Sequence, residues 1–354
     1  MKTGVLLINT GSPESPDARD VKKYLQEFLM DERVIDIPAW KRKLLVYGII
    51  APFRSKKVSR LYNNIWTSKG SPLVAYTHSL SKLIAKSTML PTEYAMRYGD
   101  PSIQNAIKSL ADKKIKTIIV VPMFPHYAMS TYESVIEKVK NEMKAFSDIK
   151  IKTIKPYYNH PDYINSLYEN SKKYFKNNFD HIIFSYHSLP IRHIYKTDDT
   201  KNTCLKFQNC CDIYNPAHEK CYKAQVLQTT KLFIKKAKLN FEINSKKLSL
   251  TYQSAMRGDW LKPSTEEKIV ELARNGYKNV LIICPGFVTD NLETIEEICI
   301  RGRNSFLSNF VSTIDVTNDK SKQKKIMPEF TFIPSLNLNK TWVKTLSKWI
   351  RDEI

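Results

Sequence analysis

An acidic segment follows an apolar stretch in the last quarter of the chain. Residues 279–284 predict a buried strand, and the segment 285–297 after it carries Glu293 and Glu297 four residues apart. If a helix begins near Asp290, the two carboxylates share one helical face, where like charges cost about 0.2–0.5 kcal/mol. Carboxylates stacked in this way offer oxygen ligands to a hard cation or a path for protons. The alternative is an ordinary solvated helix face.

A histidine follows a second apolar stretch. Residues 181–184 predict a strand, and His187 lies in the segment 185–190 directly after it. Open parallel sheets bind their ligands beyond the carboxyl ends of the strands, which is where this histidine is expected. Because a neutral imidazole accepts a proton near neutral pH, His187 is a candidate base. The alternative is a turn residue without a chemical role.

Composition narrows the class of protein. A chain of 354 residues is long enough for two domains with sizeable cores. No apolar run approaches the roughly 18 residues that cross a bilayer, and residues 1–9 predict a first strand and not a signal peptide, so we expect a cytoplasmic protein. The net charge of +21 suits an anionic membrane surface or an acidic substrate. Without a helix-turn-helix, RNA-binding or arginine-rich motif, no nucleic-acid partner is expected.

Strand and helix patterns alternate along the chain, which predicts an α/β fold with parallel sheets covered on both faces. Strands are expected at 5–9, 94–97, 117–121, 149–154, 181–185, 249–253, 280–284 and 331–333. Helices are expected at 18–29, 78–87, 103–111, 131–146, 161–175, 222–237, 265–274, 292–301 and 340–351.

The two halves of the chain repeat one pattern. Residues 107–124 read as a helix, a lysine-rich turn, an apolar strand and a Pro-x-Phe exit, and residues 269–287 repeat that order. We therefore expect two similar Rossmann-like domains whose parallel sheets face a shared cleft.

Eight stretches, in order across nearly the whole chain, match the motifs of one enzyme family. They are LINTGSPE at 7–14, Tyr62 with GSPL at 70–73, MRYGDPSI at 96–103, FPHY at 124–127, the loop around His187, CYKAQ at 221–225, QS at 253–254 with WLKP at 260–263, and FVTDNLET at 287–294. Through them the chain resembles the ferrochelatases, which insert ferrous iron into a porphyrin at the end of haem synthesis. The resemblance implies that the C-terminal helix returns to the first domain. The domains are then 1–156 with 335–354, and 157–334 with a cysteine-rich insertion at 200–222.

The resemblance also assigns chemical roles. It implies that His187 and Glu293 are the central catalytic pair and handle the substrate iron, with Glu297 and Asp290 behind them as a supporting acid path. The family's helix here often carries an extra-residue bulge, a feature common at functional sites. Many relatives have histidine where this chain has Asn291, so a histidine proton relay is not available there.

Porphyrin contacts are implied at five positions. They are Thr10, Tyr62, Ser71, Arg97 and Tyr98. Arg97 suits a propionate, because a guanidinium binds a carboxylate through two hydrogen bonds, whereas Tyr62 and Ser71 could equally serve the core and a turn. Relatives that use coproporphyrin often carry tyrosine at position 10. Threonine is too short to reach iron, which favours protoporphyrin IX over coproporphyrin III as substrate. A non-catalytic tetrapyrrole- or metal-binding protein is the alternative of another class.

Two further segments have implied roles. Residues 39–57 join an apolar run to basic clusters and a tryptophan, and the family places a hydrophobic, membrane-facing lip here, so a peripheral contact at the inner face of the membrane is expected. A buried helix is the alternative for this segment. His126, after the Phe-Pro pair, is either a secondary ligand for entering metal or a turn residue.

Four cysteines lie within 18 residues. They are Cys204, Cys210, Cys211 and Cys221. Disulfides are rare in a reducing cytoplasm, and the adjacent pair does not fit the usual C-x₂₋₄-C spacing of zinc sites. Four thiolates can hold a [2Fe–2S] cluster. Some bacterial ferrochelatases carry such a cluster on cysteines of this internal stretch, and the chain resembles that group. Zinc, or no metal, remains the alternative.

Overall fold

Two parallel sheets form the framework of the molecule. The computed structural model describes residues 2–176, 178–256, 258–311 and 328–354. Within these residues the strand order is β2-β1-β3-β4 in one sheet and β6-β5-β7-β8 in the other, and all neighbours are parallel. The strands are β1 (Thr3–Gly11), β2 (Thr92–Tyr98), β3 (Thr117–Pro122), β4 (Lys150–Thr153), β5 (His181–His187), β6 (Leu248–Gln253), β7 (Asn279–Ile283) and β8 (Glu329–Ile333). The predicted α/β class is confirmed.

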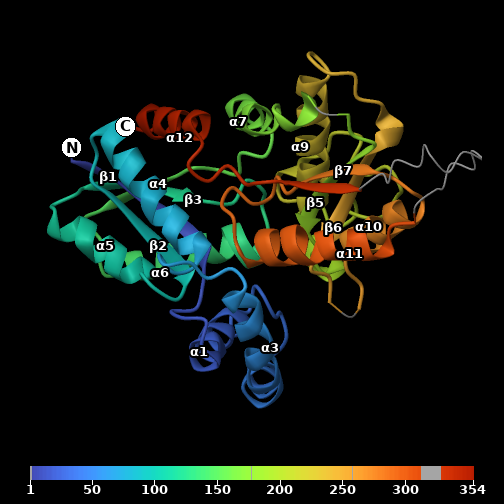
Figure 1. The fold of residues 1–354 in the computed structure, drawn as a ribbon. Coiled ribbons are helices and arrows are strands. Elements are labelled where there is room, and N and C mark those ends of the chain that lie inside the picture. Colours follow the sequence, from blue (N-terminus) through green and yellow to red (C-terminus); the bar gives the residue numbers. More distant parts are fainter. Residues whose placement is uncertain (1, 177, 257, 312–327) are drawn as a thin grey trace, which may run out of the picture.

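Helices connect the strands and cover the sheets (Figure 1). The α-helices are α1 (Ala18–Leu29), α2 (Ala39–Lys43), α3 (Ala51–Asn63), α4 (Pro72–Thr88), α5 (Ile103–Asp112), α6 (Ser134–Met143), α7 (Pro161–Ser171), α8 (Ile191–Lys196), α9 (Tyr222–Ala237), α10 (Thr265–Arg274), α11 (Arg303–Asn309) and α12 (Lys340–Asp352). Short 3₁₀ turns are η3 (Tyr174–Lys176), η4 (Pro216–Glu219) and η5 (Ser245–Lys247). Equivalent serines cap two helices: Ser102 accepts from the backbone of Asn105 at the start of α5, and Ser264 from that of Glu267 at the start of α10.

Three described segments are π-helical: η1 (Leu44–Ile50), η2 (Met129–Glu133) and η6 (Glu293–Gly302). A single helix was expected at 131–146, but η2 precedes α6 there, and η6 occupies most of the helix expected at 292–301. A π turn adds one residue per turn, which the spacing of apolar residues does not reveal. Both η2 and η6 follow the third strand of their sheet's order, so the two halves repeat even this irregularity.

One hydrophobic core joins the two sheets. It contains Val121 of the first sheet, Phe184 of the second, and Trp342 and Trp349 of α12. Helix α12 packs on α4 and α7, and so returns to the side of the first sheet. Two further cores each lie on one sheet with its own helices. The boundary proposed at residue 156 remains a prediction, because packing continues across it.

Helices α1 and α3 lie apart from both sheets, below them in Figure 1. They pack on each other, and Val21 of α1 and Tyr62 of α3, together with Ile65 just after α3, form a cluster against which Leu292 and Ile295 at the start of the acidic helix pack. This small helical unit, residues 18–63, therefore adjoins the segment that carries Glu293. No helix in the described part of the chain is long and apolar enough to cross a membrane.

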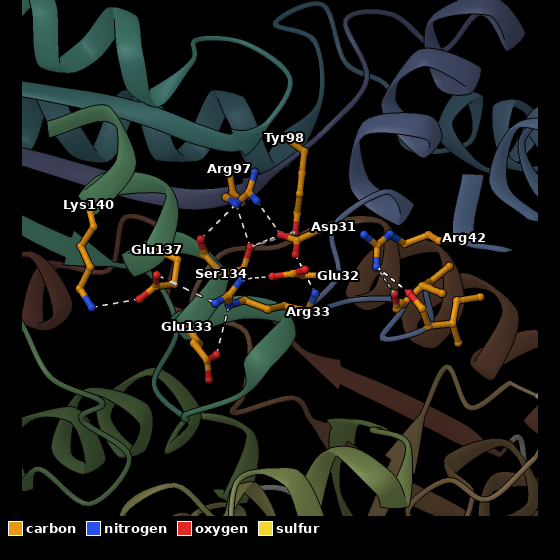
Figure 2. A network of polar contacts seen from close by, with 12 residues as sticks. Asp31, Glu32, Arg33, Arg42, Arg97, Tyr98, Glu133, Ser134, Glu137 and Lys140 are labelled. Carbon is orange, nitrogen blue, oxygen red and sulfur yellow. Dashed lines mark hydrogen bonds and ion pairs between the residues drawn. The ribbon is translucent and has the colours of Figure 1, made fainter. Parts of the chain in front are cut away.

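The connection between α1 and α2, residues 30–38, is fixed on both sides. Arg33 pairs with Glu133 of η2 at 3.1 Å, on the side of the first sheet (Figure 2). Asp36 pairs with Arg192 of α8 at 2.6 Å, on the side of the second sheet. The unit formed by residues 18–63 is thereby held against both halves of the molecule.

Candidate active site

A cavity lies between the carboxyl ends of the two sheets. It encloses about 1050 Å³, counting the open space at its mouth. More of its wall is apolar than polar, as a flat aromatic ligand requires. The residues after β1, β3, β5 and β7 line it, together with parts of α1, α3 and the start of η6. Both domains thus contribute to one site, as expected for parallel sheets.

His187 is the last residue of β5 and lines this cavity. Its Nδ1 atom lies 2.5 Å from the carbonyl oxygen of Ser188. A carbonyl only accepts, so the ring carries a hydrogen on Nδ1, and in the neutral imidazole the lone pair is on Nε2. The hydroxyl of Tyr222, another cavity residue, donates to the carbonyl oxygen of His187 at 2.9 Å. The imidazole is therefore held with its hydrogen on Nδ1, so that Nε2 is free to accept a proton.

Glu293 begins η6 and lines the same cavity. Burial raises the pKa of this carboxyl, the nearby imidazole of His187 acts against that shift, and the charge of Glu297 adds to it. The predicted catalytic pair is thus brought together, with a carboxyl that binds a proton more readily than an exposed glutamate does. An imidazole lone pair and a partly buried carboxyl in one cavity can together accept protons and bind a divalent cation.

The two supporting carboxylates are not among the residues that line the described cavity. Glu297 accepts hydrogen bonds from the backbone and the hydroxyl of Ser254. Asp290 is buried and accepts from the backbone of Ser335 at 3.1 Å and from the side chain of Asn337 at 2.6 Å. Asp290 therefore joins the start of η6 to the chain that leads into α12. Its carboxylate oxygens are used in these hydrogen bonds, which indicates a structural role.

Asn291 lies at the start of the acidic helix. Its Oδ1 accepts from the backbone of Thr294 at 2.9 Å, while its own backbone donates to the hydroxyl of Thr294 at 3.0 Å. This reciprocal pair is the arrangement that caps a helix. The side chain of Asn291 also lines the cavity. Because an amide does not titrate, this position caps the acidic helix without adding a proton-binding group to the cavity.

Three of the five predicted porphyrin contacts line the cavity. They are Thr10 near the end of β1, Tyr62 on α3 and Ser71 before α4. Sequence reasoning missed a pair of aromatic residues on α1, Tyr24 and Phe28, whose rings stack at 6.0 Å and line the same wall. Their spacing of four residues on an amphipathic helix was the available signal.

Arg97 and Tyr98 are not brought to the cavity. The Nη2 of Arg97 donates to Asp31 at 2.5 Å and its Nε to the hydroxyl of Ser134 at 2.7 Å, and Tyr98 donates to the same Asp31 at 2.9 Å (Figure 2). Burial alone would raise the pKa of Asp31, but these partners and the backbone of Arg33 hold it below its usual range. Because Arg97 neutralises this buried carboxylate, its guanidinium is not available to a propionate.

His126 lies in the cavity wall but is 3% exposed. Its Nε2 is 2.9 Å from the hydroxyl of Thr229, which itself donates to the carbonyl of Tyr158 at 2.7 Å. His126 therefore donates through Nε2, and burial lowers its pKa to about 3. It is a neutral histidine inside the molecule and not a residue at the surface where metal enters.

Comparison with known proteins agrees with this geometry. Residues 2–354 match the family model for ferrochelatase. The chain is 39% identical over 308 residues to a ferrochelatase of Opitutus terrae, covering 86% of this chain and 88% of the relative. It is 37% identical over 361 residues to one of Legionella pneumophila strain Paris, covering all of both chains. The chain belongs to the ferrochelatase family. A structure of SirB from Bacillus subtilis with Fe³⁺ shares the fold, with a TM-score of 0.54 and 11% identity over 99% of this chain and 95% of SirB.

The four cysteines of this ferrochelatase-family chain are in contact with one another. Cys210 and Cys211 have their sulfur atoms 3.7 Å apart. Hydrogen bonds from Cys204 and Cys211 lower the pKa of the Cys221 thiol. In the described residues, however, no group of three or more His, Cys, Asp or Glu side chains is arranged so that it could hold a metal ion. The thiols form a row of contacts, which does not match the tetrahedral arrangement around one zinc ion.

The loop that carries these cysteines has a fixed start. Asp198 accepts from the backbone of Thr203 at 2.9 Å and of Cys204 at 2.7 Å. This buried carboxylate orders the turn before Cys204 by hydrogen bonds alone.

Proposed function

We propose that this protein is a ferrochelatase that inserts Fe²⁺ into protoporphyrin IX to form protohaem, a lyase reaction. The observation that carries the proposal is the pairing of His187, with its lone pair on Nε2, and Glu293 in one apolar cavity between two sheets. A protein that only binds tetrapyrroles would gain nothing from burying a carboxyl beside an imidazole.

The reaction exchanges one metal ion for two protons. Fe²⁺ enters the macrocycle without a change of oxidation state, and both pyrrole N–H protons leave. In the proposed mechanism the apolar walls hold the ring beside His187, and Nε2 accepts a pyrrole proton. Glu293 binds the incoming Fe²⁺ through oxygen and releases it to the ring nitrogens. Its raised pKa also lets this carboxyl carry a proton once the metal has left.

Thr10 supports protoporphyrin as the substrate. This residue lines the cavity near the end of β1, and its side chain is too short to coordinate iron in the ring. Purified protein is incubated without oxygen with Fe²⁺ and either protoporphyrin IX or coproporphyrin III, and the change of the porphyrin Soret band is recorded. Faster metallation of protoporphyrin supports the proposal. A preference for coproporphyrin corrects the substrate, and no metallation of either porphyrin refutes the proposed reaction.

The number and closeness of the four cysteines are the basis for also proposing a [2Fe–2S] cluster. Four thiols joined in a row of contacts, three of them buried, would supply the four sulfur ligands of a two-iron cluster. Cys204, Cys210, Cys211 and Cys221 would hold it. Such a cluster supplies one-electron chemistry and a covalent link across the loop. No step of iron insertion passes through it.

The helical unit at residues 18–63 supports a peripheral membrane contact. Trp40 is 67% exposed, Leu44 65% and Phe53 77%, so large apolar side chains face solvent from α2, η1 and α3. Lysines at positions 41, 43, 56 and 57 flank them. Apolar residues bracketed by positive charge suit the surface of an anionic bilayer, from which a hydrophobic porphyrin would enter the nearby cavity.

A further inference from the structure

The loop that follows β6 holds the acidic helix at two points. Gln253, the last residue of β6, donates from Nε2 to the carbonyl oxygen of Glu293 at 3.4 Å. The next residue, Ser254, donates from its backbone to Oε1 of Glu297 at 2.8 Å and from its hydroxyl to Oε2 at 2.5 Å. This Gln-Ser pair is one of the family motifs in the sequence, and neither residue has a role in the mechanism above.

Ser254 adopts a backbone conformation that residues with a side chain avoid. Its φ is +61°, in the left-handed region. In this conformation one residue presents two donors, N–H and O–H, to the two oxygens of a single carboxylate. A strained conformation that a non-glycine residue retains is often associated with function.

Without this contact the carboxylate of Glu297 has another partner. The Nη2 of Arg301 lies 4.0 Å from Oε2, while the Nε of Arg301 binds Glu296 at 2.7 Å. The side chain of Glu297 is 23% exposed, so rotation toward Arg301 and solvent is open to it. The two hydrogen bonds from Ser254 instead fix it one helical turn beyond Glu293. Hydrogen bonds of this kind orient metal-binding side chains in proteins.

We propose that Ser254 is a positioning residue for iron delivery: it aims the carboxylate of Glu297 so that Fe²⁺ passes from Glu297 to Glu293. Ser254 does not touch the iron or the porphyrin. This inference rests on the proposed ferrochelatase activity and assigns the serine of the Gln-Ser motif a task within it.

Two replacements of Ser254 separate positioning from folding. Ser254→Ala removes the hydroxyl and retains the backbone strain, whereas Ser254→Gly removes the hydroxyl and relieves the strain. Both variants are expected to raise the KM for Fe²⁺ about 5- to 20-fold, the loss of a hydrogen bond to a charged group. The KM for protoporphyrin stays within about twofold, and Ser254→Gly melts no lower than the parent protein.

Ser109→Ala is the matched control, because the hydroxyl of Ser109 donates to the carboxylate of Glu93 at 2.7 Å and neither residue is among those lining the described cavity. It is expected to leave both KM values unchanged. A double-mutant cycle completes the test: in a Glu297→Gln background, Ser254→Ala adds less than about twofold if the serine acts through Glu297.

The outcomes are distinguishable. An Fe²⁺ KM that does not move in either Ser254 variant, or a porphyrin KM that moves equally, overturns the positioning role. So does an effect of Ser254→Ala that persists in full without Glu297. A parent protein that metallates no porphyrin refutes the proposed function itself, and the role of Ser254 with it.

Discussion

The Nδ1 of His187 and the carbonyl oxygen of Ser188 are 2.5 Å apart, and this contact decides which ring nitrogen can act as a base. A hydrogen on Nδ1 leaves Nε2 as the acceptor. Since Ser188 follows β5 directly and its own backbone binds the carbonyl of Gln253 at 2.8 Å, the orientation of the imidazole is built into the edge of the sheet.

Replacing His187 with alanine should reduce iron insertion by at least about 100-fold, the usual scale for loss of a general base, while porphyrin binding persists. Turnover is measured by the Soret change and binding by fluorescence quenching. His78→Ala is the control, since this histidine stacks on Tyr94 and is not among the residues lining the described cavity. Near-normal turnover in His187→Ala would mean that another group takes the proton.

Glu293→Gln should impair catalysis more than Glu297→Gln, because only Glu293 of the two lines the cavity. Its raised pKa also predicts an effect on stability. The folded state holds the proton of Glu293 more tightly than the unfolded state does, so this contribution to stability is complete at low pH and is lost as pH rises through the raised pKa. At pH 8, Glu293→Gln should therefore melt above the parent protein, and the difference should shrink below pH 4. The opposite order of catalytic severity would exchange the roles of the two carboxyls.

The sequence predicted all eight described strands, and the central ones are apolar because a parallel sheet buries them on both faces, whereas the edge strand β4 alternates between lysine and less exposed residues. The sequence could not predict the partners of Arg97. Asp31 is 66 residues away in sequence and meets it only after the connection at 30–38 has packed on the first sheet. Composition also does not reveal a π turn or the left-handed backbone of Ser254. Which face of η6 each residue occupies, and the hydrogen bonds from Ser254 to Glu297, are therefore seen only in the structure. Helices α8 and α11 are only six and seven residues long, too short to show a clear periodicity.

His126 should make the protein sensitive to acid. Burial lowers its pKa to about 3, so between pH 6.5 and 3 the unfolded state binds a proton that the folded state does not. This contribution to stability is complete above pH 6.5 and falls by up to roughly 1.4 kcal/mol for each pH unit below it. Melting temperatures at pH 7.5 and 5.5 test this against His126→Gln, which retains an N–H donor for Thr229. Equal losses in both proteins would show that His126 does not contribute.

The exposed apolar residues of α2, η1 and α3 should bind anionic vesicles. Sedimentation with vesicles that contain phosphatidylglycerol is expected to recover the parent protein, and Leu44→Ser with Phe53→Ser should weaken binding, since each loses buried apolar area in the bilayer surface. Leu239→Ser is the control, as Leu239 is 74% exposed and lies just beyond the end of α9. Binding that is equal in all three proteins, or that is the same with neutral vesicles, would argue against this surface.

The four-cysteine row predicts a coloured protein. Chain purified without oxygen should be red-brown and contain about two irons per molecule, because each thiol of the row supplies one ligand of a two-iron cluster. Replacing any of Cys204, Cys210, Cys211 or Cys221 with serine should bleach the visible absorption. The iron is measured directly, so the result does not depend on catalysis. Asp198 orders the start of the loop by itself, so the colour should be lost with only a moderate fall in melting temperature.

Two other cysteines provide the matched controls for the cluster. Cys284, which follows β7, and Cys299 in η6 are both reduced, and neither is in the cysteine-rich insertion. Cys284→Ser and Cys299→Ser should retain the colour and the two irons. If the protein is colourless and contains one zinc ion per chain, the cysteines form a zinc site and the cluster proposal is wrong. Since iron insertion is assigned to His187 and Glu293, that result would leave the proposed reaction unchanged.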